Sequence, residues 1–128
     1  MKLRIQDSSL RFRLTQKEVS QLRDCGWVEA EVPFDPRRPF RYSIFTSENV
    51  QDLVIDYSPD SIRVVLPPSV VNDWANSDQV SIAGRGRIQV LVEKDFQCLH
   101  GPDRWDPDAW PNPLLNSSPS DLVVEPRT

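Results

Sequence analysis

A weak internal repeat is the feature that most constrains the fold of this 128-residue chain. The alternating segments at residues 3–5 and 9–14 have counterparts at residues 53–55 and 61–66. In each copy a short polar turn separates the two segments. Alternation of apolar and polar residues is typical of β-strands that have one buried face. Both copies therefore predict a hairpin of two strands.

A short helix is expected after each hairpin. Thr15 and Glu18 have the spacing of a capping box, and Gly26 suits the left-handed residue that ends a helix. The second helix is predicted to begin at Pro67-Pro68, because proline in the first turn loses no needed donor, and to stop at Asn76.

Two further alternating segments follow each helix, at residues 27–32 and 40–45 and again at 79–82 and 87–92. The chain thus reads as a tandem ββαββ arrangement, with halves at residues 1–47 and 48–94. Neither half has enough apolar area to be stable alone, so the halves should share a core. Antiparallel strands that curl into a curved or barrel-like sheet would remove exposed edges. The sequence therefore predicts an α+β single domain, mainly antiparallel, with two short helices.

The pattern changes at residue 95, after which half of the 12 prolines occur. Phe96, Trp105, Trp110 and Leu114 are large apolar side chains that would anchor residues 95–115 against the domain. We therefore expect one domain over residues 1–115, including this packed C-terminal arm. Residues 116–128 should form a flexible acidic tail.

The distribution of charge limits the classes of partner. Residues 1–47 carry a net charge of +3 and residues 48–94 carry −3, a balance from which we expect no concentrated basic face of the kind that nucleic-acid binders have. No run reaches the ~18 apolar residues of a membrane span, and the N-terminus is no secretory signal. A cytoplasmic protein is expected, with neither nucleic acid nor membrane as a partner. The opposite charges suit halves that attract each other, or a homodimer.

Three segments together resemble a known family. They are Met-Lys-Leu-Arg-Ile at residues 1–5, Ser-Leu-Arg-Phe-Arg-Leu-Thr at residues 9–15, and Glu-Lys-Asp-Phe-Gln-Cys-Leu-His at residues 93–100, with a later Pro-Asn-Pro at 111–113. Over residues 1–113 the chain is similar to small bacterial proteins described only as being of unknown function. The resemblance implies a bacterial, cytoplasmic, single-domain protein and supplies no activity, substrate or partner.

Cys98 and His100 are the residues with the most reactive chemistry. Two positions apart on an extended segment, they project to one side and have zinc-binding side chains. Their spacing matches no recognised zinc motif, and neighbours on one strand rarely form a nucleophile–base pair. We expect no catalytic residue, no cofactor and no bound metal, with Cys98 and His100 as minor metal candidates.

Arginine and glutamate side chains occupy the polar faces of the predicted strands. The candidates for ligand or partner binding are Arg11, Arg13, Glu29, Glu31, Arg41 and Glu93. If these faces pointed into a barrel, they would resemble the tunnel of the triphosphate tunnel enzymes, where arginines hold phosphates and carboxylates hold Mg²⁺. The Glu-x-Glu-x-Lys run of that family is missing, because Glu29-Ala30-Glu31 is followed by Val32-Pro33. The simpler arrangement has the apolar faces inside.

These observations favour a non-enzymatic binding or accessory protein. Its site is expected where the last strand ends and Trp105 and Trp110 cross the sheet, either as a lid or as an exposed patch for a protein partner. The alternative is an enzyme or binder that acts on a phosphorylated or nucleotide-like small molecule through the Arg/Glu-lined face.

Overall fold

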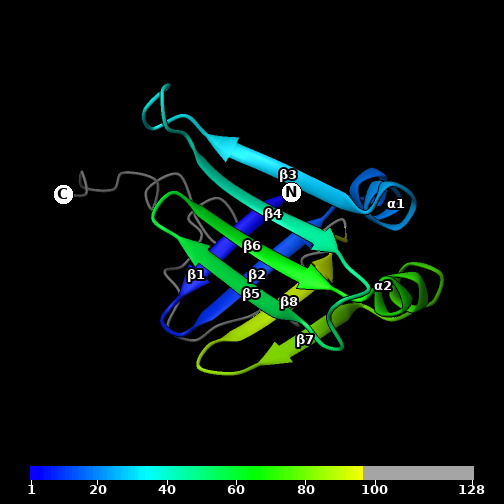
Figure 1. Cartoon of the computed structure of the whole chain (residues 1–128). Coiled ribbons are helices and arrows are strands. Elements are labelled where there is room, and N and C mark those ends of the chain that lie inside the picture. The colour runs from blue at the N-terminus through cyan, green and yellow to red at the C-terminus, as the bar shows by residue number, and fades with distance from the viewer. Residues whose placement is uncertain (97–128) are drawn as a thin grey trace, which may run out of the picture. The chain divides into compact units, whose positions relative to one another are not determined.

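The order of strands and helices follows the repeat in the sequence. The computed structural model describes residues 1–96, and the first half contains β1 (Lys2–Gln6), β2 (Ser9–Leu14), α1 (Gln16–Cys25), β3 (Trp27–Val32) and β4 (Phe40–Thr46) (Figure 1). The second half contains β5 (Val54–Ser58), β6 (Ser61–Leu66), α2 (Pro68–Ala75), β7 (Ser81–Arg85) and β8 (Gln89–Lys94). The predicted ββαββ order is confirmed in both halves.

The strands form two four-stranded sheets, each of which takes one hairpin from each half. Sheet A has the order β1-β2-β8-β7, and sheet B has the order β3-β4-β6-β5. Exchanging the two halves converts one order into the other, so the halves are related by a pseudo-twofold arrangement. The predicted α+β class is confirmed, with two open mixed sheets in place of one closed barrel.

Both sheets contain a central parallel pair, β2 with β8 and β4 with β6, whereas the hairpin pairs are antiparallel. The parallel pairing follows from the path of the chain. Strand β2 runs toward the helices and enters α1, and β8 returns to the same end after its turn with β7 (Figure 1). Alternating apolar residues fit parallel and antiparallel neighbours equally, so the sequence pattern did not predict which strands would meet.

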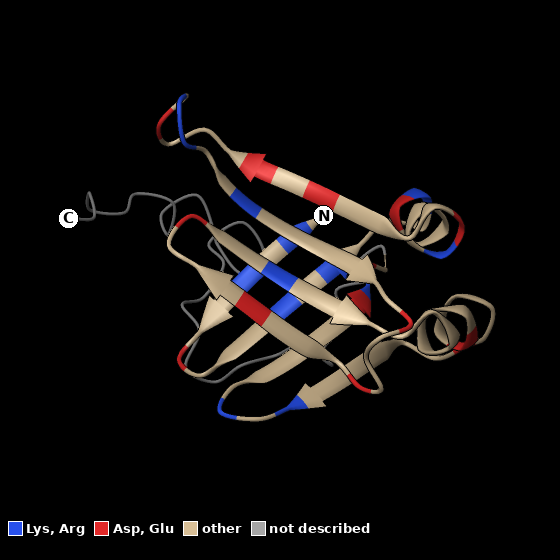
Figure 2. Cartoon of the chain, viewed as in Figure 1, with Lys and Arg blue, Asp and Glu red and all other residues tan. Residues whose placement is uncertain are grey.

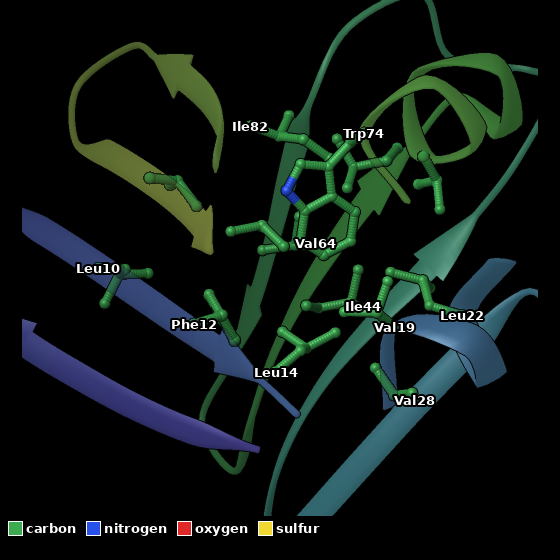
Figure 3. Close-up of a cluster of buried hydrophobic side chains, with 14 of the residues drawn as sticks. Leu10, Phe12, Leu14, Val19, Leu22, Val28, Ile44, Val64, Trp74 and Ile82 are labelled. Atoms are coloured by element: carbon green, nitrogen blue, oxygen red, sulfur yellow. The ribbon is translucent and has the colours of Figure 1, made fainter. Parts of the chain in front are cut away.

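One hydrophobic core lies between the sheets. Its buried side chains come from both sheets and both helices, and Figure 3 shows Trp74 of α2 among Val64 and Ile82. The matching triplets of the repeat, Leu10, Phe12 and Leu14 with Ile62, Val64 and Leu66, are all buried. The two halves therefore share this core, to which both contribute buried apolar side chains.

Caps and one indole hydrogen bond fix the helices. Thr15 and Glu18 form the predicted capping box, and Gly26 ends α1 with a φ of 89°, a conformation that L side chains rarely adopt. In α2, the indole Nε1 of Trp74 donates to the carbonyl oxygen of Val80 at 3.0 Å.

Both helices lie side by side at one end of the sheets (Figure 1), where Arg23 donates a hydrogen bond to Asn76 at 3.2 Å. No helix within residues 1–96 therefore covers the outer face of either sheet. Neither helix of this part of the chain has the length and apolar character needed to cross a bilayer.

Candidate functional site

The outer face of sheet A is strongly basic. The register places five lysines and arginines of its strands on this face, Lys2, Arg4, Arg11, Arg13 and Arg85, against one carboxylate, Glu93. The strands of sheet B carry two basic and three acidic residues. Figure 2 shows blue bands along β1 and β2 and red bands on β3. Each sheet contains strands from both halves, so the charges of the strands also differ between the two sheets, in addition to the difference between the halves of the sequence. The folded chain thus has a basic face that its net charge conceals.

Glu93 lies at the centre of one cluster on this face. Its Oε1 atom is 3.3 Å from Nε of Arg11 and 3.7 Å from Nε of Arg13, and the side chain is only 14 % exposed. Two guanidinium groups thus share one carboxylate, which leaves one positive charge in excess. Beside them, the ammonium group of Lys2 pairs with Asp95 at 3.0 Å.

Arg4 lies directly opposite Arg11 on the neighbouring strand. Its guanidinium donates a hydrogen bond to the amide oxygen of Gln6 at 3.0 Å, and none of the ion pairs within residues 1–96 involves it. Like charges in directly opposed cross-strand positions are destabilising. The pair therefore costs free energy unless an anion lies between the two groups.

A pocket of about 290 Å³ opens at this arginine pair. It is lined by Arg4, Gln6, Ser9, Leu10, Arg11, Gln89 and Leu91. Guanidinium groups bind phosphate and carboxylate oxygens through two parallel hydrogen bonds, and hydroxyl and amide groups add neutral donors. Chemically, the pocket is suited to hold a small anion.

A second, more open hollow of about 480 Å³ lies at the turn between β7 and β8. It is lined by Ser8, Arg85, Gly86, Arg87, Ile88 and Gln89. The alternating segment at residues 87–92 had predicted that Arg87 lies on a strand. In the structure β7 continues to Arg85, and β8 begins only at Gln89. Arg87 therefore belongs to the turn.

The structure divides the predicted Arg/Glu set between the two sheets. Arg11, Arg13 and Glu93 lie together on sheet A. Glu29, Glu31 and Arg41 lie on sheet B, where Nε of Arg41 is 3.3 Å from Oε2 of Glu31. The six residues do not line one face, and the apolar faces of both sheets point inward, so no tunnel of the triphosphate tunnel type forms within residues 1–96.

An aromatic row marks the outer face of sheet B. Trp27, which is 45 % exposed, stacks on Phe45 with a centroid distance of 6.2 Å, and the guanidinium of Arg63 lies 4.3 Å from the centroid of the Phe45 ring. The guanidinium of Arg63 is thus engaged in a cation–π contact with the Phe45 ring. The two outer faces thus differ in chemistry, one being basic and the other aromatic with mixed charges.

Some predicted candidates lie outside the described residues, namely Cys98, His100, Trp105 and Trp110. Within residues 1–96, no cluster of three His, Cys, Asp or Glu side chains is arranged to hold a metal ion.

Sequence reasoning also missed Gln6, Ser9 and Gln89 as pocket residues. The signal that could have found them is the period of two, which places them on the same face as the arginines.

The chain belongs to a family of unknown function, DUF7009, whose model matches residues 1–114. This membership agrees with the resemblance to small proteins of unknown function. The chain matches no curated protein and no solved structure.

Proposed function

We propose that this member of the family is a binding protein that holds a small phosphorylated molecule on the outer face of sheet A. Arg4 and Arg11 are the principal contacts. The side-chain amides of Gln6 and Gln89, which also line the pocket, would donate further hydrogen bonds, whereas the Ser9 hydroxyl already donates to the carbonyl oxygen of Gln6 at 2.9 Å. The single observation that carries the proposal is the opposed arginine pair at the mouth of a pocket.

Within the described part of the chain, the protein leaves positive charge at this pocket without a compensating carboxylate. Arg4 takes part in no ion pair within residues 1–96, and Arg11 shares one carboxylate with Arg13. A phosphoryl group between Arg4 and Arg11 would replace a repulsion with charge-assisted hydrogen bonds. The volume of about 290 Å³ is near the lower end for small-molecule sites, which favours a compact ligand.

Binding is proposed here in preference to catalysis. Phosphoryl transfer needs metal ions and a group that positions the nucleophile, in addition to donors that hold the phosphates. The pocket residues supply guanidinium, amide and hydroxyl donors, and no carboxylate is among them. These groups are suited to hold an anion and to release it unchanged.

The test is isothermal titration with inorganic phosphate and pyrophosphate at low ionic strength, supported by thermal shift. We expect saturable binding that weakens as salt is added, because screening reduces the arginine–phosphate attraction. At a ligand concentration of 100 times Kd, the free energy of unfolding should rise by about 2.7 kcal/mol.

Two variants make this test specific. Arg4→Gln should lower affinity at least tenfold, since it removes one of the two principal charges. Arg38→Gln removes the same charge from an exposed loop and should leave affinity within twofold of the wild type. Equal affinity of Arg4→Gln and wild type, or no binding of either anion by the wild type, would overturn the proposal.

A further inference from the structure

We infer that the ligand of sheet A carries two phosphoryl groups, one held by Arg4 and Arg11 and the other by Arg85 and Arg87. This inference rests on the proposed function and names the class of ligand. It comes from the position of the second hollow. Gln89 lines both the pocket and the hollow at the β7–β8 turn, so the two are neighbours on one surface.

Backbone hydrogen bonds hold the second arginine pair in place. The amide N–H of Gln89 donates to the carbonyl oxygen of Ser8 at 2.9 Å, which joins the β7–β8 turn to the β1–β2 turn. Within the β7–β8 turn, the N–H of Gly86 donates to the carbonyl oxygen of Ile88 at 3.2 Å. Arg85 is the cross-strand partner of Gln89. Arg85 at the end of β7 and Arg87 in the turn are therefore held beside the pocket by backbone hydrogen bonds.

The second pair also lacks internal compensation. Both side chains are exposed, and neither takes part in any ion pair found among residues 1–96. With Arg4 and Arg11, four arginines thus line the two adjoining hollows. Clustered charge of one sign attracts a polyvalent anion more strongly than a monovalent one.

The distance between the two arginine pairs indicates how long a ligand must be to contact both. Arg11 and Arg85 lie two strands and two residues apart in register, which places their Cα atoms about 12 Å from each other at the usual strand spacing and rise. A single phosphate in the first pocket is held by the arginines that line that pocket, Arg4 and Arg11, whereas Arg85 and Arg87 line the adjoining hollow. A linear polyphosphate, or a compact skeleton with a phosphate at each end, reaches both pairs across Gln89.

Titration with tripolyphosphate and with inorganic phosphate tests this inference. The wild type should bind tripolyphosphate at least tenfold more tightly. The double substitution Arg85→Gln/Arg87→Gln should remove most of that preference and leave the affinity for inorganic phosphate within twofold. Both arginines are exposed, so unfolding curves should show that the variant keeps its stability.

The matched control is Arg37→Gln/Arg38→Gln, which removes two exposed charges from the loop between β3 and β4. If both double variants lose equal affinity for tripolyphosphate, the two-phosphate inference is wrong, whereas the proposed function still stands on the loss seen in Arg4→Gln. If the wild type binds neither anion, the proposed function fails and this inference fails with it.

Discussion

Arg4 and Arg11 are directly opposed across β1 and β2, and Glu93 forms its ion pairs with Arg11 and Arg13. The face is therefore short of negative charge at Arg4. In the unliganded protein this arrangement costs free energy, and a bound anion would offset that cost. Sites that bind ligands often keep such unfavourable contacts at the expense of stability.

Arg4→Gln should consequently act in opposite directions on binding and on stability. Relief of the repulsion with Arg11 should raise the free energy of unfolding of the unliganded protein by about 0.5 kcal/mol, on the scale of other cross-strand charge pairs. Urea unfolding at low salt measures this, and added salt should shrink the gain. A loss of stability in Arg4→Gln would show that its guanidinium stabilises the free protein.

Glu93→Gln should increase affinity for phosphate several-fold. The carboxylate competes with the ligand for Arg11, and its neutralisation frees that guanidinium while preserving the shape of the side chain. The same change should lower stability by about 1 kcal/mol, because Arg13 also loses its partner. Isothermal titration and urea unfolding give the two quantities.

Glu31→Gln is the control for the Glu93 variant. Glu31 pairs with Arg41 at the same 3.3 Å separation, on sheet B. Its neutralisation should leave phosphate affinity unchanged. Equal gains in both variants would indicate a general effect of net charge and would argue against direct competition at Arg11.

Gly84→Ala should destabilise the fold by about 1–3 kcal/mol through overpacking. A Cβ atom at this position would lie 2.8 Å from Cδ2 and 3.0 Å from Cβ of Leu53, so the segment before β5 would have to shift. Gly86→Ala is the matched control, since nothing lies within 4 Å of its Cβ position. Thermal and urea unfolding compare the two, and equal stabilities would show that the contact with Leu53 adapts freely.

Acid should weaken the start of α1. Burial raises the pKa of Glu18, but hydrogen bonds from the Met1 ammonium and from Thr15, together with the charge of that ammonium, outweigh burial and lower the pKa below its usual value. A carboxyl whose pKa is lowered by folding stabilises the protein above its unfolded pKa. That stabilisation is lost as the pH falls below 4.5 and through the lowered value.

In Glu18→Gln, the free energy of unfolding should therefore fall less steeply as the pH is lowered from 7 to 3. The capping geometry should be kept, because glutamine also serves in a capping box. Glu48→Gln, at an exposed position, should leave the pH dependence of the free energy of unfolding as it is in the wild type. Urea unfolding between pH 3 and pH 7 measures both variants. An unchanged slope in Glu18→Gln would contradict this role of Glu18.

Local features of the fold were readable from the sequence because they depend on neighbours in the chain. Thr15 and Glu18 predicted the start of α1, and Gly26 predicted its end. The alternation at Leu10, Phe12 and Leu14 predicted which face of β2 would be buried. Short-range sterics and hydrogen bonds determine these features.

The order of strands in each sheet and the chemistry of the outer faces were harder to predict from the sequence. Pairing of β2 with β8 joins residues about 80 positions apart in the chain, as in Ser9 with Gln89, and depends on how the two halves close on their core. The candidates Arg11, Arg13 and Glu93 proved to be neighbours, because β2 and β8 are adjacent, whereas Glu29 and Glu31 lie on the other sheet. Only knowledge of the sheet order could separate these two groups.

The proposed phosphate site on sheet A is tested most directly by an NMR titration of the backbone amides with pyrophosphate. The largest changes in chemical shift should occur at Ser9, Arg11 and Gln89, which line the pocket, and should saturate with a single dissociation constant. Amides of sheet B, such as those of Glu29 and Ser43, should not move. Shifts centred on sheet B, or the absence of any saturable change at the pocket, would contradict the account.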